Sequence, residues 1–372
     1  MKDKILHPLN PAPYQELPVF QGNVGNALLE RMKVNLSKNG DFVCLINGFY
    51  SCQNQTEGCG VKNKLFSNLI LDSCLYANAF WKHGLRKGDV VHFQIPNCTD
   101  YHCLALAVWA CEGIASLADP GLSPGVLKSQ LEDTNAKFIL CYRRSRKTVL
   151  EALKLSGKLG HVKVIMLEKA DLDQEDFELR ENEEEFMFFQ DFVDDAEKLE
   201  QPPLLQNGPL DDDETVVIFW SSGTTGNPKG IQHTVRTMRF LMLDFEFRAK
   251  LDPKLPVLLT TCFFHIGGFM SILEITHFKT NFIFNNGYDL DQDGKTCQAI
   301  YKQIDAYRPW RLVCGSHHCV QLTKERPLDK NLNLDSVLMV LPMGSTVPES
   351  MYEDLKPYMP NLALVCQGLA MT

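Results

Sequence analysis

The chain has 372 residues, of which 45% are hydrophobic and 22% charged. A chain of this length buries a large core and exceeds one ordinary domain. Its net charge of −9 and its isoelectric point near 5.6 argue against a nucleic acid or an anionic membrane as a partner.

The sequence contains no apolar window long enough to predict a membrane-spanning helix, and its N-terminal residues lack the apolar core of a signal peptide. The thirteen cysteines are therefore expected to be reduced thiols of an intracellular protein. Cys52 and Cys59 could suggest a metal, but no second pair and no nearby histidine completes a site, so no metal ligand is assigned.

The first part of the chain alternates predicted strands and helices. Helices are predicted near 23–36 and over 65–81, 101–111 and 124–134. Strands are predicted over 42–48, within 85–97, and over 114–117 and 137–140. This alternation predicts an α/β fold with a parallel, doubly wound sheet.

Residues 168–200 carry fifteen acidic side chains. A calcium site or a basic partner is conceivable, but like charges repel one another, and a solvated, mobile linker is the favoured interpretation. We therefore predict a first α/β subdomain over residues 1–167, an acidic linker region over 168–214 and a second α/β subdomain over 215–372.

A loop rich in glycine and hydroxyl groups follows the apolar strand predicted over 215–220. Glycine lets backbone N–H groups turn toward an anion, hydroxyls add donors, and a lysine supplies a mobile positive charge. The pattern fails the Walker and dinucleotide-binding spacings, so it predicts another kind of phosphate loop. Its candidate phosphate-binding residues are Ser221, Ser222, Gly223, Thr224, Thr225, Gly226 and Lys229.

The run from Phe219 to Gly230 closely resembles the signature of the adenylate-forming superfamily, which includes acyl-CoA synthetases, 4-coumarate-CoA ligase-like enzymes and luciferases. The block Gly88–Val91 and the turn from Asn97 to Asp100 come in the family's order. The resemblance implies that the loop holds the β- and γ-phosphates of ATP. It also implies the family's large N-terminal domain, with two stacked, mostly parallel sheets flanked by helices.

After a helix predicted over 234–247, a second block resembles the family's Pro-x-Phe-His-x-x-Gly segment. It contains His265, Gly267 and Gly268, with Cys262 near the usual proline. The resemblance implies that these residues lie beside an acyl pocket. The alternative is a core histidine at a strand end, hydrogen-bonded to the backbone.

A helix is predicted over 300–307, and a third segment then gathers Cys314, His317, His318 and Cys319. These residue types could bind zinc, but their spacing matches no common site. Adjacent histidines would also point to opposite faces of an extended segment. The resemblance instead implies a strand followed by the start of a helix, near the acyl pocket.

The last two segments complete the resemblance. Residues 334–348 are predicted to form a strand and a glycine turn like the family's Gly-Gly-Ala-Pro-Leu segment, and the C-terminal residues resemble Gln-Gly-Tyr-Gly-x-Thr-Glu. Leu369 and Ala370 replace the aromatic residue and the glycine, which weakens the expected stacking on adenine. The residues implied to border adenine and AMP are Gly344, Ser345, Thr346, Gln367, Gly368, Leu369, Ala370 and Thr372.

The family reaction has two steps. ATP and a carboxylic acid give an acyl-adenylate and pyrophosphate, and a thiol, usually coenzyme A, then displaces AMP. The resemblance therefore implies ATP, Mg²⁺, coenzyme A and a fatty or aryl acid as ligands. The family's magnesium-binding glutamate, hinge and small C-terminal domain with its lysine would follow Thr372. We therefore expect a truncated large domain without a complete set of catalytic residues.

Three functions remain open at this point. The chain is a shortened copy of an acyl- or aryl-CoA ligase, a non-catalytic relative that binds a nucleotide or an acyl ligand, or a luciferase-like monooxygenase. The substitutions Leu369 and Ala370 fit the second function, and no residue favours oxygen chemistry. The expected location is cytoplasmic or peroxisomal.

Overall fold

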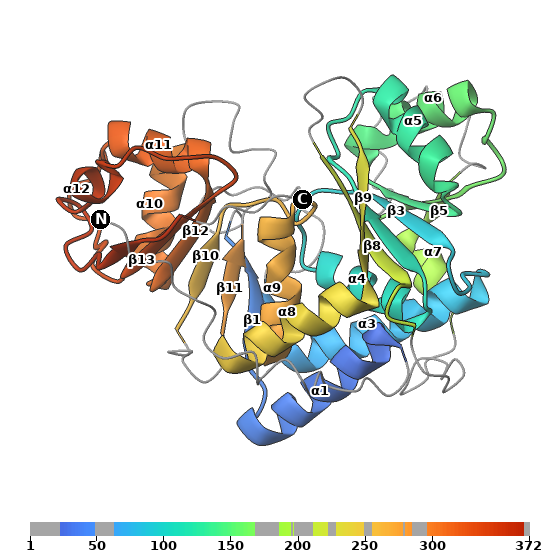
Figure 1. Ribbon diagram of the computed structural model, residues 1–372, viewed down its shortest axis with the longest axis horizontal. Helices are drawn as coiled ribbons and strands as arrows, with labels where there is room; N and C mark the ends of the chain where they lie inside the picture. Colours follow the sequence, from blue (N-terminus) through green and yellow to red (C-terminus); the bar gives the residue numbers. More distant parts are fainter. Residues whose placement is uncertain are drawn as a thin grey trace, which may run out of the picture.

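The computed structural model describes residues 23–48, 63–167, 186–194, 196, 211–221, 228–248, 255–277, 280–284 and 296–367. Within these residues the chain forms two seven-stranded sheets flanked by helices, as Figure 1 shows. The predicted architecture is confirmed. In the same residues, no helix combines the length and the apolar character that crossing a membrane requires.

The first sheet has the strand order β7-β6-β5-β3-β4-β8-β9. Neighbouring strands are parallel except for the hairpin of β8 and β9. The strands are β3 (Val90–Gln94), β4 (Ile114–Leu117), β5 (Phe138–Cys141), β6 (Lys163–Met166), β7 (Phe186–Phe188), β8 (Thr215–Trp220) and β9 (Gly230–Thr234).

The second sheet has the strand order β14-β13-β12-β10-β11-β1-β2. Neighbouring strands in this sheet are parallel, except that β1 and β2 at one edge are antiparallel. The strands are β1 (Val43–Asn47), β2 (Asn63–Leu65), β10 (Val257–Leu259), β11 (Phe282–Phe284), β12 (Arg311–Gly315), β13 (Met339–Met343) and β14 (Leu364–Val365).

Each sheet contains strands from both the N-terminal and the C-terminal part of the chain. β1 and β2 come from the N-terminal part yet lie at the edge of the second sheet, where β1 pairs with β11. β8 and β9 come from the second half yet complete the first sheet, where β8 pairs with β4. The division of the chain at 168–214 stays a prediction, and strands from both sides of it contribute to each sheet.

A helical layer joins the two sheets (Figure 1). It consists of α1 (Val24–Asn39), α3 (Phe66–Lys82), α4 (Tyr101–Ala110), α8 (Val235–Arg248) and α9 (Ile266–His277). α4 is apolar all round, and every one of its residues is buried, as this pattern requires. From α4, Trp109 donates its indole N–H to Val216 O at 2.9 Å and packs edge-on against Phe269 of α9.

The outer faces of the sheets are covered by further helices. α5 (Pro124–Thr134) and α6 (Arg146–Ser156) bury aliphatic residues against the first sheet. The short helix η2 (Arg143–Ser145) leads into α6. Three helices pack buried apolar residues against the second sheet: α10 (Thr296–Tyr307), α11 (Ser316–Lys324) and α12 (Met351–Leu355).

Residues 186–194 of the acidic segment form regular structure, against the expectation of a solvated linker there. β7 extends the first sheet beside β6, and α7 (Phe189–Asp194) follows it. Phe192 is fully buried, with its ring centroid 5.0 Å from that of Phe80. The apolar residues between the acidic ones explain the difference, because burying aromatic rings stabilises this edge.

Candidate functional site

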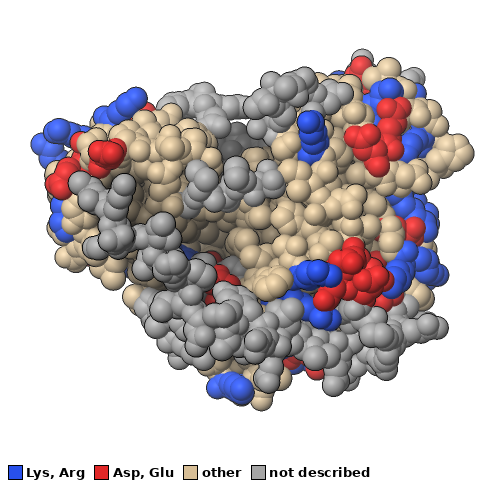
Figure 2. Space-filling view, in the orientation of Figure 1, with Lys and Arg blue, Asp and Glu red and all other residues tan. Residues whose placement is uncertain are grey.

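The carboxyl ends of the parallel strands carry the predicted site residues that the structure describes. Ser221 directly follows β8, Gly344 directly follows β13, and Gln367 lies two residues after β14. His265 lies in the segment between β10 and α9. Ligands of open α/β sheets bind at this edge. We call the part of the molecule built on each sheet a lobe. Figure 2 shows that the surface is hollowed between the two lobes.

The predicted phosphate loop connects β8 to β9. Of its candidate residues, Ser222, Gly223, Thr224, Thr225 and Gly226 lie outside the described residues, so their phosphate contacts stay a prediction. The two ends of the loop are held together: the Ser221 N–H donates to Lys229 O at 2.9 Å, and the Lys229 N–H donates to Ser221 Oγ at 3.3 Å. We call Ser221 and Lys229 the neck of the loop. Lys229 is exposed there.

His265 caps the first turn of α9. Its carbonyl accepts hydrogen bonds from Gly268 N at 3.0 Å and Phe269 N at 2.9 Å. Its side chain is exposed rather than enclosed in the core, with the ring 4.5 Å from that of Phe264. Partial desolvation by the surrounding protein lowers the pKa of His265, and the charge of Asp119 opposes this shift. At pH 7 the imidazole is therefore neutral, and it is open to a ligand.

Asp119 lies two residues after β4 of the first sheet, and its charge acts on His265, which lies between β10 of the second sheet and α9. Gln94, at the end of β3, donates its Nε2 to Asp119 O at 2.9 Å. Asp119 is not among the candidate residues that the sequence pattern indicates. The available signal was a carboxylate two residues after a buried strand, at the edge where ligands bind.

Gly267 and Gly268 let the start of α9 approach its neighbours closely. A Cβ atom at Gly268 would lie 2.2 Å from Cys262 O, which is a backbone clash. A Cβ atom at Gly267 would lie 3.2 Å from Cε of Met343, the last residue of β13. The predicted acyl-pocket residues therefore lie directly beside the turn predicted to border adenine.

Asn97 connects the two sheets at this edge. Its Nδ2 donates to Thr261 O at 3.0 Å, and its Oδ1 accepts the Phe263 N–H at 2.6 Å. A side-chain amide can donate and accept at once, so one buried residue fixes both ends of a short backbone segment. That segment leads to His265, a role that the resemblance of Asn97 to a family turn did not predict.

Ser316, the first residue of α11, holds the turn predicted to border adenine. Its Oγ lies 2.9 Å from Met343 O and 2.6 Å from Ser345 O, and it accepts the Ser345 N–H at 2.9 Å. Gln367 donates its Nε2 to the same Ser345 O at 3.0 Å. Gly344 has a φ of 108°, which favours glycine, and Thr346 is exposed.

Gln367 and the Gly344–Ser345 turn thus lie together, and their contact with adenine stays a prediction. The other candidate adenine residues lie outside the described part of the chain. They are Gly368, Leu369, Ala370 and Thr372.

Cys314 and Cys319 form a disulfide, which corrects the expectation that all the cysteines are thiols. β12 ends and α11 begins between them, and this reversal places their Cα atoms 6.3 Å apart, within the usual range for a disulfide. The alternative of zinc binding by this segment loses its two thiolate ligands. The rings of His317 and His318 lie with their centroids 3.8 Å apart.

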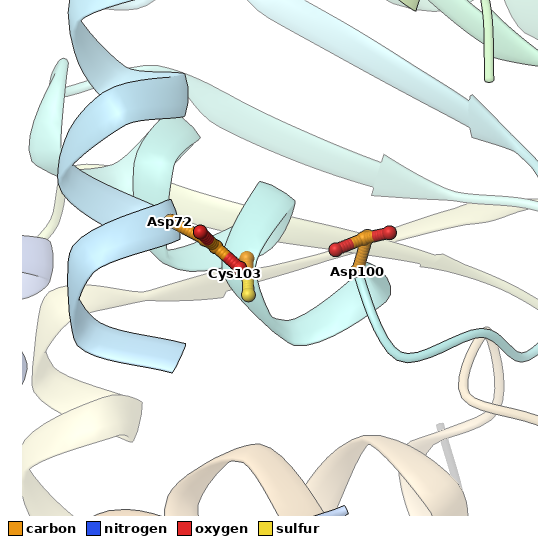
Figure 3. A group of neighbouring side chains, drawn as sticks. All are labelled: Asp72, Asp100 and Cys103. Carbon is orange, nitrogen blue, oxygen red and sulfur yellow. The ribbon is translucent and has the colours of Figure 1, made fainter. Parts of the chain in front are cut away.

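A separate cluster gathers Asp72, Asp100 and Cys103, whose ligand atoms lie within 4.8 Å of one another (Figure 3). The buried Lys64 Nζ lies 2.7 Å from Asp72 Oδ2, 2.5 Å from Asp100 Oδ1 and 3.6 Å from Cys103 Sγ. The ammonium group supplies the positive charge that these carboxylates require. We therefore interpret the group as a buried ion cluster rather than a metal site.

Comparison with protein families matches residues 62–372 to the AMP-binding enzyme model. The chain is 26% identical to acyl-CoA synthetase 7 of Caenorhabditis elegans, covering 94% of this chain and 60% of that protein. It is also 26% identical to 4-coumarate–CoA ligase 2 of Petroselinum crispum, covering 54% of this chain and 31% of that protein. The chain thus spans between about a third and two thirds of the length of these relatives.

Among solved structures, the luciferase-like enzyme from the nonluminescent Zophobas morio mealworm superposes with a TM-score of 0.74 at 21% identity. The superposition covers 94% of this chain and 72% of that one. At this identity the likeness concerns the fold, which agrees with the two stacked sheets described above.

Proposed function

Because the chain belongs to the AMP-binding enzyme family, we propose that it serves the ATP-dependent activation of a carboxylic acid as an acyl-adenylate. One observation carries this proposal: the neck of the phosphate loop, His265 and the Gly344 turn all lie at the edge formed by the carboxyl ends of β8, β10 and β13, where ligands of open α/β sheets bind. Asn97 ties this edge of the first sheet to the segment that follows β10 of the second.

In the proposed reaction, the acid's carboxylate attacks the α-phosphate of ATP and pyrophosphate leaves. Catalysis of phosphoryl chemistry of this kind consists mainly of positioning and of offsetting negative charge. Lys229, exposed at the neck, supplies a mobile positive charge beside the loop predicted to hold the β- and γ-phosphates. Mg²⁺ bound to ATP would offset further charge on the same phosphates.

The acid is placed beside His265, Gly267 and Gly268, and its proposed class is a fatty or aryl carboxylic acid. The neutral imidazole of His265 is open to a ligand and adds no charge repulsion or attraction for the acyl part. The names of the two relatives, an acyl-CoA synthetase and a 4-coumarate–CoA ligase, support this class. Coenzyme A is the proposed thiol acceptor of the second step.

The test is acid-dependent exchange of labelled pyrophosphate into ATP, together with calorimetric titration of ATP. Lys229→Ala should weaken ATP binding at least tenfold, because hydrogen bonds to charged groups contribute about 1.5–3 kcal/mol. Lys128→Ala, on α5, is the matched control and should leave the affinity unchanged. An unchanged affinity of Lys229→Ala would contradict the assignment of the phosphate loop.

A second candidate function is binding of a nucleotide or an acyl ligand without catalysis. Leu369 and Ala370 favour it, since they replace the family's aromatic residue and glycine in the segment implied to stack on adenine. The same experiment separates the two functions. Binding of ATP without acid-dependent exchange supports the second, and exchange supports the first.

A further inference from the structure

Trp220 is the last residue of β8 and lies directly before the neck of the phosphate loop. Its indole Nε1 donates a hydrogen bond to Ser116 Oγ at 3.0 Å. Ser116 is fully buried in β4, the strand beside β8. An indole N–H can only donate, so the serine hydroxyl is the acceptor and its own proton is available for a further bond.

The hydrogen bonding continues to β3. Ser116 and His92 oppose each other in the parallel register, and His92 Nδ1 lies 3.1 Å from Ser116 Oγ. Burial lowers the pKa of His92 to about 4, so its imidazole is neutral at pH 7. The hydroxyl accepts from Trp220 and lies within hydrogen-bond distance of His92 Nδ1, which gives a chain of hydrogen bonds across three strands.

The indole ring covers Gly230, the residue that follows Lys229. Trp220 and Gly230 oppose each other in the hairpin register. A Cβ atom at Gly230 would lie 3.3 Å from Cη2 and Cζ3 of Trp220 and 3.1 Å from Cγ2 of Ile218. The ring therefore lies against the backbone at the point where the loop rejoins the sheet. A side chain at Gly230 would require the ring or Ile218 to shift.

We infer that Trp220 is a positioning residue that fixes Lys229 at the neck of the phosphate loop. The hydrogen bond to Ser116 holds the indole in the orientation that covers Gly230. This contact and the Ser221–Lys229 hydrogen bond together define the backbone from which the lysine side chain extends. The inference rests on the proposed function where it concerns ATP.

This role predicts an effect confined to the phosphate end of the nucleotide. Trp220→Phe keeps a ring over Gly230 but removes the N–H that orients it. The dissociation constant of MgATP should rise about three- to tenfold, the effect of losing one hydrogen bond. AMP, which lacks the β- and γ-phosphates, should bind with unchanged affinity.

The experiment compares the full chain with Trp220→Phe, Ser116→Ala and the double variant by calorimetric titration of MgATP and AMP. The double variant should lose no more affinity for MgATP than the more affected single variant, because both substitutions remove the same bond. Trp310→Phe is the matched control. Trp310 lies before β12 in the other lobe, and the described residues provide no hydrogen-bond partner for its Nε1.

Hydrogen–deuterium exchange of the peptides spanning residues 211–234 tests the same role without a nucleotide. Faster exchange in Trp220→Phe than in Trp310→Phe is the expected result. Each of three results would overturn the inference. They are equal exchange in Trp220→Phe and Trp310→Phe, equal affinity of Trp220→Phe and the unaltered chain for MgATP, and a loss of affinity for AMP in Trp220→Phe as large as that for MgATP. If the unaltered chain binds no MgATP, the proposed function fails, and the exchange measurement alone decides whether Trp220 fixes the neck.

Discussion

Lys64 is a buried lysine whose charge is balanced within the protein. It is 3% exposed and lies between Asp72 and Asp100, with Cys103 and Tyr76 nearby. Burial by itself would lower the pKa of Lys64, but Cys103, Asp100 and Asp72 outweigh it and raise that pKa. The lysine therefore stays charged, and its removal would leave two acidic groups uncompensated.

We predict that Lys64→Met lowers the free energy of unfolding by about 3–5 kcal/mol, the cost of removing one partner of a buried ion pair. Urea denaturation measures the change. Lys33→Met is the control, since Lys33 pairs with Glu30 on the surface and should change stability by no more than about 1 kcal/mol. Similar losses in the two variants would contradict the interpretation of Lys64 as a buried counter-ion.

Two buried histidines give stability a predicted dependence on pH. Burial, aided by the charge of Lys64, lowers the pKa of His102 to about 3, and burial lowers the pKa of His92 to about 4. Unfolded histidine has a pKa near 6.5, so between about pH 4 and 6.5 the unfolded chain binds more protons than the folded one. The contribution of these two histidines to the free energy of unfolding is therefore fully present above pH 6.5 and decreases as the pH falls toward 4.

Replacing one of these histidines should make stability less dependent on pH. His102→Gln should flatten the fall in unfolding free energy by up to about 1.4 kcal/mol per pH unit between pH 6.5 and 4.5. Urea denaturation at several pH values provides the slope. His161→Gln, at an exposed position, should retain the slope of the unaltered chain, and an identical slope in His102→Gln would contradict the prediction.

Single residues at the candidate site were only partly predictable from the sequence. Lys229 and His265 belong to ordered local motifs, so a linear pattern identifies them. Asn97, Asp119 and Ser116 act through partners that are distant in the chain, such as Thr261, and no local pattern contains that information. The Cys314–Cys319 disulfide was missed because it depends on the reversal between β12 and α11.

At the scale of elements, α9 requires a glycine where it begins. Gly268→Ala would place a Cβ atom 2.2 Å from Cys262 O, and the backbone cannot move away without disturbing the segment that carries His265. We predict a loss of about 1–3 kcal/mol in unfolding free energy, as for other overpacked sites. Thermal denaturation measures it.

Gly125→Ala is the matched control for this prediction. Gly125 lies in α5, and a Cβ atom there would meet no atom within 4 Å. Alanine is the better helix former, so this variant should be unchanged or more stable by up to about 1 kcal/mol. A Gly268→Ala variant as stable as Gly125→Ala would show that the start of α9 has room that the structure does not indicate.

Most elements follow from hydrophobic periodicity, with bounds shifted by a few residues. The predicted strand over 114–117 agrees with β4, and the predicted helix over 124–134 agrees with α5. α10 begins at Thr296, before the predicted start at 300, because Thr296 and Gln298 interrupt the apolar pattern of its first turn. β7 and α7 were not predicted, because the acidic residues around them indicated a solvated linker.

At the scale of the molecule, the pairing of strands could not be predicted from local patterns alone. The apolar run of β1 resembles that of β3, yet β1 joins the second sheet and β3 the first. Which sheet a strand joins depends on contacts between residues that are far apart in sequence. The resemblance to the family supplied the two-sheet architecture without assigning each strand.

Because each sheet contains strands from both parts of the chain, we predict that neither half of the chain folds independently. A fragment of residues 211–367 lacks β4, which pairs with β8, and β1, which pairs with β11. Its exposed strand edges and uncovered apolar residues should prevent cooperative unfolding in urea and favour aggregation. Refolding it together with residues 23–167 should restore a transition. A sharp transition of the isolated fragment would contradict this prediction.

The position of β1 also affects how the protein is made. β1 can pair with β2 soon after both leave the ribosome, but its other edge waits for β11. Roughly 240 residues separate the two strands, and translation at about 5–20 residues per second needs on the order of ten to fifty seconds to supply them. During that time the apolar edge of β1 is available to other chains. Folding in the cell should therefore depend on chaperones that bind the N-terminal region during synthesis.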